Sequence, residues 1–239
     1  MKAIILAAGK GSRISEKIDG IPKSTLKLDD GTPIIRRTVQ NMVNNNIMPI
    51  VCVGYKKELI YEALDGLDVK YYVNPFYAIT NNIVSLWFSI DEFDDDDILL
   101  TSADLYYPEK FLGLMQKATG NISMAVDSSR IETGDFYFSV GDNKKINQYG
   151  PETPLIDRTY EYMGLSKISK NFVGNVKERI KEYIDHEFFD KYFEDLLINY
   201  NIKDNEPITY VDVAGEFWRE FDFYEDYQAI LDYERKRLK

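Results

Sequence analysis

The chain has 239 residues, which is long enough for one large α/β domain or two small ones with a sizeable core. Hydrophobic residues make up 44% and charged residues 29%, a balance that excludes disordered, collagen-like and coiled-coil chains. The formal net charge of −11 argues against broad binding to nucleic acid or to an anionic membrane, although a local phosphate site stays compatible with it.

Cysteine and histidine are too rare for several kinds of site. Cys52 is the single cysteine, so an intramolecular disulfide framework is excluded. His186 is the single histidine, which excludes a multi-histidine metal site and makes a soft-ligand zinc site a poor fit. The apolar run near Met1 is too short for a signal sequence or a membrane span, and we therefore expect a cytoplasmic protein that does not insert into membranes.

Strand and helix patterns alternate through the first half of the chain. A continuous apolar run at residues 3–8 predicts a strand buried on both faces, and it runs into a glycine-rich turn. Thr32 and Pro33 are typical of a helix start, with Thr32 as the cap. Beyond this first helix we predict strands at 50–53, 69–73 and 98–101, and helices at 57–64, 81–93 and from Pro108 onward.

The second half is less regular. Residues 136–149 predict a hairpin that turns at residues 141–144. The remaining predicted elements are strands at 124–126, 160–168 and 209–213, a helical stretch over 172–200 and a closing amphipathic helix at 224–238. With no repeat and no Pro/Gly/Ser hinge, the pattern favours a single domain over residues 1–239, with a nucleotide-binding half at about 1–120 and an acceptor-binding and cap region at about 121–239.

Alternation of strands and helices predicts an α/β protein with a mainly parallel sheet. In such sheets, ligands bind outside the carboxyl ends of the strands. The first predicted strand delivers a turn of glycine, alanine and basic residues to that edge, Leu6-Ala7-Ala8-Gly9-Lys10-Gly11-Ser12-Arg13, and Pro22-Lys23 follows. Backbone N–H groups of such a turn can approach an anion, and Arg13 and Lys23 supply positive charge for phosphate oxygens.

This turn differs from two common nucleotide-binding loops. The third glycine of a dinucleotide fingerprint is replaced by Ile14, and the residues before Lys23 lack the glycine of a Walker A loop. The run instead resembles the L-A-A-G-x-G-x-R…P-K signature of nucleotidyltransferases that activate small phosphorylated compounds. The stretches at 74–86 and 220–227 are similar to those of CTP:phosphocholine cytidylyltransferases and related aminoalkylphosphonate cytidylyltransferases, whereas residues 14–18 depart from the sugar-phosphate members.

The resemblance implies a Rossmann-like three-layer sandwich with a mainly parallel, mixed sheet and a C-terminal cap region. It also implies catalytic roles for Arg13 and Lys23 and a Mg²⁺ ion held by Asp104 and Asp222. Two carboxylates suit Mg²⁺, which completes its octahedron with water and phosphate oxygens. Without the resemblance, Asp104 reads as a residue of a strand-end turn and Asp222 as a helix cap.

The remaining site residues are also expectations from the resemblance. Those predicted to contact the nucleotide are Leu6, Ala7, Ala8, Gly9, Gly11, Ser12, Arg13, Asn81, Asn82 and Ser85. For the last three, capping of the helix start is an equally good interpretation. Lys23, Tyr106, Glu161 and Trp218 are predicted to contact the acceptor, since carboxylates and aromatic faces favour an amine or trimethylammonium group.

The expected reaction is a Mg²⁺-dependent transfer of CMP from CTP to a small phosphorylated or phosphonate amino-alcohol, such as phosphocholine or 2-aminoethylphosphonate, with release of pyrophosphate. One alternative is a sugar-1-phosphate nucleotidyltransferase that uses UTP, dTTP or GTP. The other is a catalytically silent nucleotide-binding module. The sequence leaves the acceptor, the pathway and the oligomeric state open.

Overall fold

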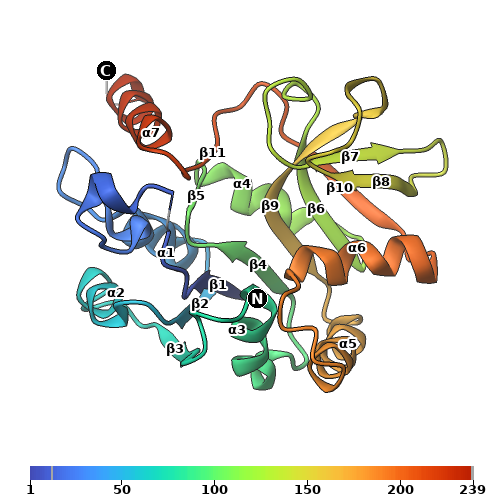
Figure 1. Ribbon diagram of the computed structural model, residues 1–239, viewed down its shortest axis with the longest axis horizontal. Coiled ribbons are helices and arrows are strands. Elements are labelled where there is room, and N and C mark those ends of the chain that lie inside the picture. Colours follow the sequence, from blue (N-terminus) through green and yellow to red (C-terminus); the bar gives the residue numbers. More distant parts are fainter. Residues whose placement is uncertain (12, 238–239) are drawn as a thin grey trace.

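The computed structural model describes residues 1–11 and 13–237, with the side chains of Ser15 and Glu16 left aside. A central sheet separates two layers of helices (Figure 1), so the predicted three-layer α/β architecture is confirmed. Along the sheet the strand order is β10-β6-β9-β4-β1-β2-β3. Within the described ranges, no helix is both long and apolar enough to cross a membrane.

The first half of the chain forms the parallel part of this sheet. β1 (Lys2–Ala7) pairs in parallel with β2 (Met48–Val53) on one side and with β4 (Ile98–Ser102) on the other, and β3 (Lys70–Val73) pairs with β2. β1 and β2 are buried along almost their whole length, as expected for strands covered on both faces. Because these strands run the same way, their carboxyl ends, and the turns that follow them, meet at one edge.

The second half reverses direction. β9 (Tyr160–Ile168) is antiparallel to both β4 and β6 (Ile122–Asp127), and β10 (Ile208–Asp212) is parallel to β6. The predicted hairpin is present as β7 (Tyr137–Val140) and β8 (Ile146–Gly150), which extend from β9. The sheet is therefore mixed, with its antiparallel pairs confined to residues after 120 and their junction with β4.

Each face of the sheet has its own helices and its own core. One core places α3 (Asn82–Phe88), α5 (Val173–Asp185) and α6 (Phe193–Asp204) against Ile4 and Leu100 of the sheet. The opposite core places α1 (Ile34–Asn44), α2 (Lys57–Ala63) and α4 (Lys110–Lys117) against Ile5 and Leu99. Alternate residues of the same strands thus serve the two cores, which is the period-two pattern of an extended chain.

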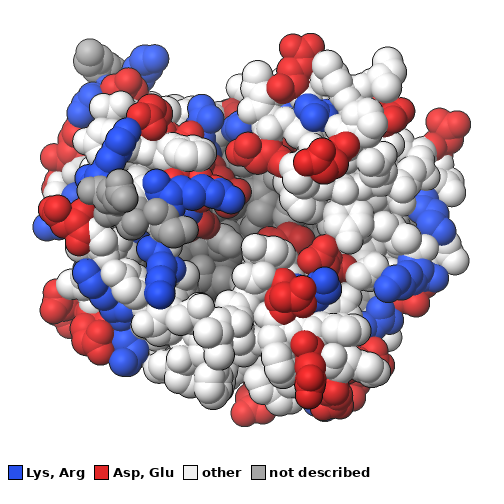
Figure 2. Space-filling view, in the orientation of Figure 1, with Lys and Arg blue, Asp and Glu red and all other residues white. Residues whose placement is uncertain are grey.

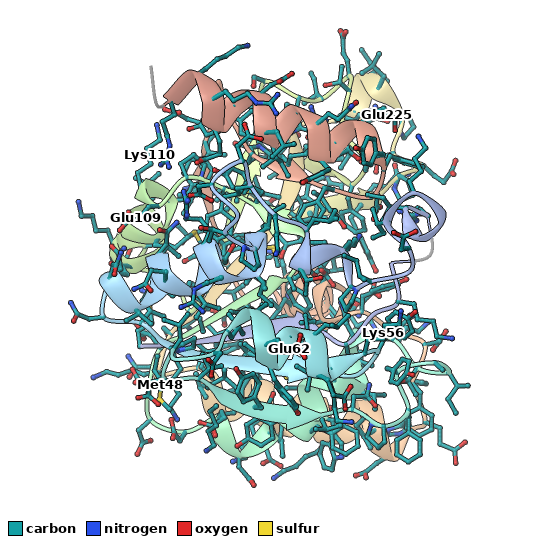
Figure 3. The ribbon with its side chains drawn as sticks, turned by 90° about the vertical axis from the view of Figure 1, so that its left-hand side faces the viewer. Met48, Lys56, Glu62, Glu109, Lys110 and Glu225 are labelled. Carbon is teal, nitrogen blue, oxygen red and sulfur yellow. The ribbon has the colours of Figure 1, made fainter. Side chains whose placement is uncertain are left out.

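The closing helix forms a third, smaller core. α7 (Tyr224–Arg237) packs through Ile230 on Ile34, Tyr106 and Phe221. Figure 3 shows α7 lying above α1 on the flank of the molecule, with the labelled Glu225 at its first turn. The C-terminal segment is thereby fixed against the first half of the chain.

Two predictions about helices were wrong in detail. The stretch predicted as helical over 172–200 is interrupted between α5 and α6, where Glu187 adopts the left-handed conformation with φ of 58°. No glycine or proline marks this break, so local sequence signals do not predict it. The first helix begins one residue later than predicted, with Pro33 rather than Thr32 at its cap position, because Lys27 and Pro33 form a bridge just before it.

Candidate active site

The carboxyl ends of the parallel strands open into a cleft of about 440 Å³. Figure 2 shows the molecule hollowed at this place, between the two halves of the chain. The glycine-rich turn after β1, the start of α3 and the end of β4 contribute to its lining. Predicted nucleotide residues that line the cleft are Leu6, Ala7, Ala8, Gly9, Gly11, Arg13, Asn81, Asn82 and Ser85, whereas Ser12 lies outside the described residues.

The glycine-rich turn keeps its shape through close contacts that only small residues allow. Gly11 has φ of +61°, a conformation that glycine adopts without strain, and a Cβ there would lie 3.2 Å from Cγ of Lys23. At Gly54, which follows β2, a Cβ would lie 2.8 Å from the Cβ of Tyr77 and 2.9 Å from the carbonyl oxygen of Ala8. The turn therefore lies tightly between Lys23 and the residues after β2.

The start of α3 is held by the opposite half of the chain. Asn81 donates its backbone N–H to the carbonyl of Phe189, and Asn82 accepts a 2.8 Å hydrogen bond from the N–H of Phe193. Asn81 occupies the cap position of α3 without a side-chain cap bond. Ser85 is buried and accepts a bond from Asn74. Asn81 and Asn82 therefore tie the start of α3 to the segment that leads into α6, whereas Ser85 bonds within its own half of the chain.

Three acidic side chains meet beside the cleft, and Asp104 and Asp222 belong to its lining. Asp104, Glu220 and Asp222 each place a carboxylate oxygen within 4.8 Å of the others. Asp104 follows β4, and Glu220 and Asp222 come from the last quarter of the chain, so the structure brings together the two aspartates that the sequence paired. Sequence reasoning missed Glu220, although its spacing of two from Asp222 in an extended segment indicates a shared side.

A short two-stranded sheet creates this meeting. β5 (Leu105–Tyr106) pairs with β11 (Arg219–Glu220), and the N–H of Phe221 donates to the carbonyl of Asp104 at 3.0 Å. Asp104 directly precedes one strand of the pair, and Asp222 comes two residues after the other. The separation of the two carboxylates therefore depends on backbone pairing between segments that are far apart in the sequence.

Basic side chains complete the group of charges. Nζ of Lys23 lies 2.7 Å from Asp104 and 2.6 Å from Asp222, and Arg13 is ion-paired with the other oxygen of Asp222. Burial lowers the pKa of Lys23, but the two carboxylates outweigh this effect and raise the pKa above the usual lysine value. Lys23 is therefore a fixed positive charge at neutral pH. Lys10 adds a further cation to the cleft lining.

The carboxylate group has the donor atoms that Mg²⁺ requires. Oδ1 of Asp104 is buried and has no hydrogen-bond partner among the described residues, so it is free to act as a ligand. Hard carboxylate oxygens at close spacing are the protein ligands that Mg²⁺ prefers. Desolvation raises the pKa of Glu220 to about 8, the charges of Asp104 and Asp222 add to the increase, and the charge of Lys23 opposes it.

The predicted acceptor residues are not all in one place. Tyr106 is buried among Phe217, Tyr233 and α7, and its hydroxyl donates to Glu234, so the structure does not bring it into the cleft lining. Glu161 and Trp218 line a small neighbouring cavity together with Glu220. Only Lys23 of the predicted acceptor set lines the cleft itself.

Glu161 and Trp218 already hold a cation from the chain. The guanidinium of Arg130 lies 4.1 Å from the centre of the Trp218 ring, and its Nε lies 2.7 Å from Glu161. The indole N–H of Trp218 donates to Asp127 at 2.9 Å. Both Glu161 and Trp218 are 3% exposed, so this pair is closed to an acceptor in the described structure.

Comparison with known proteins relates this chain to a family of nucleotidyltransferases. Residues 3–133, more than half of the chain, match the MobA-like NTP transferase domain. A choline-phosphate cytidylyltransferase of Streptococcus pneumoniae is 27% identical over 96% of both chains. A CMP-5'-(3-aminopropyl)phosphonate synthase of Streptomyces rubellomurinus is 31% identical over 45% of this chain and 18% of its own length.

Two further matches are a sugar-phosphate uridylyltransferase and a solved cytidylyltransferase structure. The UTP–glucose-1-phosphate uridylyltransferase of Haloferax volcanii is 28% identical over 44% of this chain and 43% of its own. The solved structure of CTP:phosphocholine cytidylyltransferase from Streptococcus pneumoniae superposes with a TM-score of 0.75 at 21% identity, covering 98% of both chains. The fold and the resemblance to cytidylyltransferases expected from the sequence are confirmed, and the chain belongs to the MobA-like NTP transferase family.

Proposed function

We propose that this nucleotidyltransferase is a Mg²⁺-dependent cytidylyltransferase that moves CMP from CTP to a small phosphate or phosphonate carrying an amine or a quaternary ammonium group. The observation that carries the proposal is the joint position of Arg13, Lys23 and the carboxylate group beside a glycine-rich turn in one cleft. CTP is favoured because relatives that match over almost the whole chain are cytidylyltransferases.

The chemistry follows from the charges. The phosphate or phosphonate oxygen that attacks the α-phosphorus is already ionised, so no general base is required. The obstacle is repulsion: two unit charges about 4 Å apart repel by about 4 kcal/mol at an effective dielectric constant of about 20. Lys23 lies in the cleft between two carboxylates, and Arg13 is ion-paired with one of them. In the proposed reaction Lys23 offsets the charge of donor and acceptor, and Arg13 binds the terminal phosphates.

Asp104 and Asp222, with Glu220 beside them, would hold Mg²⁺, which when bound would neutralise charge on the phosphate oxygens. The other contribution of the chain is alignment. The turn at residues 8–11 and the start of α3 hold the nucleotide from two sides, so that the acceptor oxygen and the pyrophosphate leaving group can lie in line.

A screen of nucleotides and acceptors tests this proposal. We expect pyrophosphate release with CTP and phosphocholine or 2-aminoethylphosphonate, and little with glucose 1-phosphate. The rival function is a sugar-1-phosphate nucleotidyltransferase, which the match to a uridylyltransferase supports. Turnover of UTP, dTTP or GTP with glucose 1-phosphate, and none with CTP, would establish that rival instead.

Substitution of one carboxylate separates an enzyme from a nucleotide-binding module that turns nothing over. We expect Asp222→Asn to lower kcat by at least about 100-fold while CTP still binds. Asp185→Asn is the matched control, because Asp185 is exposed at the end of α5. A wild-type protein that binds CTP but releases no pyrophosphate with any acceptor would support the silent module.

A further inference from the structure

The strand that delivers Glu220 and Asp222 to the carboxylate group is too short to hold its own place. β11 contributes only Arg219 and Glu220 to its pairing with β5. A two-stranded pair is at best marginally stable in water unless other packing supports it. On the other side, β5 follows Asp104, which comes two residues after β4 of the central sheet. The position of β11 must therefore depend on the residues that flank it.

Trp218, the residue before β11, is held by three contacts from the second half of the chain. Its indole N–H donates a 2.9 Å hydrogen bond to Asp127, a buried residue at the end of β6. The guanidinium of Arg130 lies 4.1 Å from the centre of the indole ring. Nη1 of Arg130 also donates a 3.0 Å hydrogen bond to the backbone carbonyl of Trp218. Arg130 therefore binds both the side chain and the main chain at the start of β11.

Arg130 is in turn held by the central sheet. Its Nε lies 2.7 Å from Glu161 of β9, whose other carboxylate oxygen accepts a 3.0 Å hydrogen bond from the N–H of Asp135. Gly134 packs so closely on this carboxylate that a Cβ at position 134 would overlap it. A guanidinium can stack on a ring, pair with a carboxylate and donate to a carbonyl in one fixed geometry, which the ammonium group of a lysine cannot do.

Arg130 and Trp218 lie near the carboxylate group but outside the lining of the cleft. Both line the small neighbouring cavity that Glu220 also borders, and neither belongs to the cleft lining. Trp218 is two residues from Glu220 and four from Asp222, so a shift of its backbone would move both carboxylates relative to Asp104. Mg²⁺ demands near-ideal octahedral geometry, and its affinity is therefore sensitive to the positions of its ligands.

We infer that Arg130 is a positioning residue for the carboxylate group. By holding Trp218, Arg130 sets the place of β11. β11 in turn places Glu220 and Asp222 at the separation from Asp104 that a bound divalent cation requires. The inference rests on the proposed function in one respect, because Mg²⁺ is the cation proposed there. In this role Arg130 contacts neither the reactants nor the metal ion.

Metal binding by the protein alone tests this role without turnover. Mn²⁺, which takes the same oxygen ligands as Mg²⁺, is titrated into the protein, and free Mn²⁺ is measured by electron paramagnetic resonance. We expect Arg130→Met to raise the Kd for Mn²⁺ by about tenfold, as is typical when a group that orients metal ligands is lost. Arg130→Lys should give an intermediate Kd, since it keeps the charge but not the stacked fork. Asp222→Asn should abolish the binding, which identifies the site.

The dependence of activity on Mg²⁺ is a second measurement. The Mg²⁺ concentration at half-maximal rate should rise in Arg130→Met by a similar factor, while kcat at saturating Mg²⁺ and the KM for CTP stay near their wild-type values. Arg179→Met is the matched control. The Arg179 guanidinium is stacked at 4.3 Å on Tyr200 and lies 2.7 Å from Asp204, on helices α5 and α6 away from β11 (Figure 1). This variant should lose stability without a change in metal affinity.

An unchanged Kd for Mn²⁺ in a folded Arg130→Met variant would overturn the inference, as would a wild-type protein that binds no Mn²⁺. If Arg130→Met does not fold, Arg130→Lys is measured together with Trp218→Phe, which keeps a ring but loses the bond to Asp127. An unchanged Kd in both of these variants contradicts the inference. A wild-type protein that binds Mn²⁺ through Asp222 but releases no pyrophosphate from CTP with any acceptor would overturn the proposed function and leave the role of Arg130 standing.

Discussion

The two walls of the cleft are built in different ways. The wall that we propose to face the nucleotide comes from short segments of the parallel half, at residues 6–11, 13, 22–24 and 77–85, and Lys10, Arg13 and Lys23 lie in its lining. The opposite half, after residue 120, is antiparallel and aromatic, and its polar groups are largely paired with one another, as Arg130 is with Glu161 and Trp218. The comparison teaches that a motif in the sequence identifies the first wall, whereas the second can be assigned only from tertiary contacts.

The largest effect is expected at Lys23, whose ammonium group pairs with Asp104 from the first half of the chain and Asp222 from the second. Lys23→Met should lower kcat by about 100-fold or more, because the cation that offsets repulsion between donor and acceptor is lost. The free energy of unfolding should fall by only about 1 to 2 kcal/mol, since Asp222 keeps its ion pair with Arg13. Steady-state kinetics and chemical denaturation measure the two quantities.

Lys117→Met, at the exposed end of α4, is the control for the loss of a lysine. We also expect Mg²⁺ to raise the thermal midpoint of Lys23→Met more than that of the wild type, because the carboxylates have lost their resident ammonium group. A strongly destabilised variant with wild-type kcat would show that Lys23 only supports the structure.

A smaller effect should follow from crowding the nucleotide wall. Gly54→Ala places a methyl group 2.8 Å from Tyr77 and 2.9 Å from the backbone of Ala8, so the glycine-rich turn must shift. We expect an unfolding free energy lower by about 1 to 3 kcal/mol and a raised KM for CTP, with the KM of the acceptor little changed.

Gly113→Ala provides the opposite case. Gly113 lies inside α4, where an added methyl group would meet no atom of the described residues within 4 Å. Alanine there should stabilise the protein by up to about 1 kcal/mol. If Gly54→Ala leaves both stability and the KM for CTP at their wild-type values, the close packing at the turn does not matter for nucleotide binding.

A still smaller effect distinguishes Tyr106 from a residue that contacts the acceptor. Tyr106→Phe removes the hydroxyl that donates to Glu234, which keeps its ion pairs to Arg37 and Arg237 at 3.1 Å. We expect the unfolding free energy to fall by about 1 kcal/mol and the KM for every acceptor to stay within about twofold of the wild type. A selective increase of the KM for one acceptor would instead indicate that Tyr106 contacts that acceptor.

A further effect is a dependence of stability on pH in the second half of the chain, at Glu161. Burial raises the pKa of Glu161 to about 7, although Arg130 opposes the shift. Between the ordinary glutamate pKa of 4.5 and pH 7, the folded state then holds a proton that the unfolded state has lost. Stability from this group is therefore fully present below pH 4.5 and is lost as the pH rises to about 7, by about 1 to 3 kcal/mol.

Glu161→Gln has no such proton to lose. Denaturation of both proteins at several pH values should show the variant gaining stability relative to the wild type as the pH rises through this window. A difference that is independent of pH between 4.5 and about 7 would mean that the ion pair with Arg130 keeps Glu161 charged throughout.

Features that depend on local sequence could be predicted, whereas features that depend on contacts between distant segments could not. The order of elements, the mainly parallel sheet and the cleft at the strand ends follow from local periodicity and turn residues. The resemblance implied the mixed sheet, and the signature from Leu6 to Lys23 indicated the residues of the first wall. The break at Glu187 and the pairing of β5 with β11 depend on contacts between distant segments. For the same reason Glu220 was missed, and Tyr106 was placed beside its sequence neighbour Asp104 although its side chain enters another core.

The pairing of Leu105–Tyr106 with Arg219–Glu220 has a consequence for how the protein can change. This ladder joins the residue after Asp104 to the residues just before Asp222, so the separation of the two carboxylates is set by a short backbone pairing and not by the long stretch of chain between them. Changes in length at an exposed turn of that stretch, such as the turn between β7 and β8, would therefore leave the two carboxylates in register.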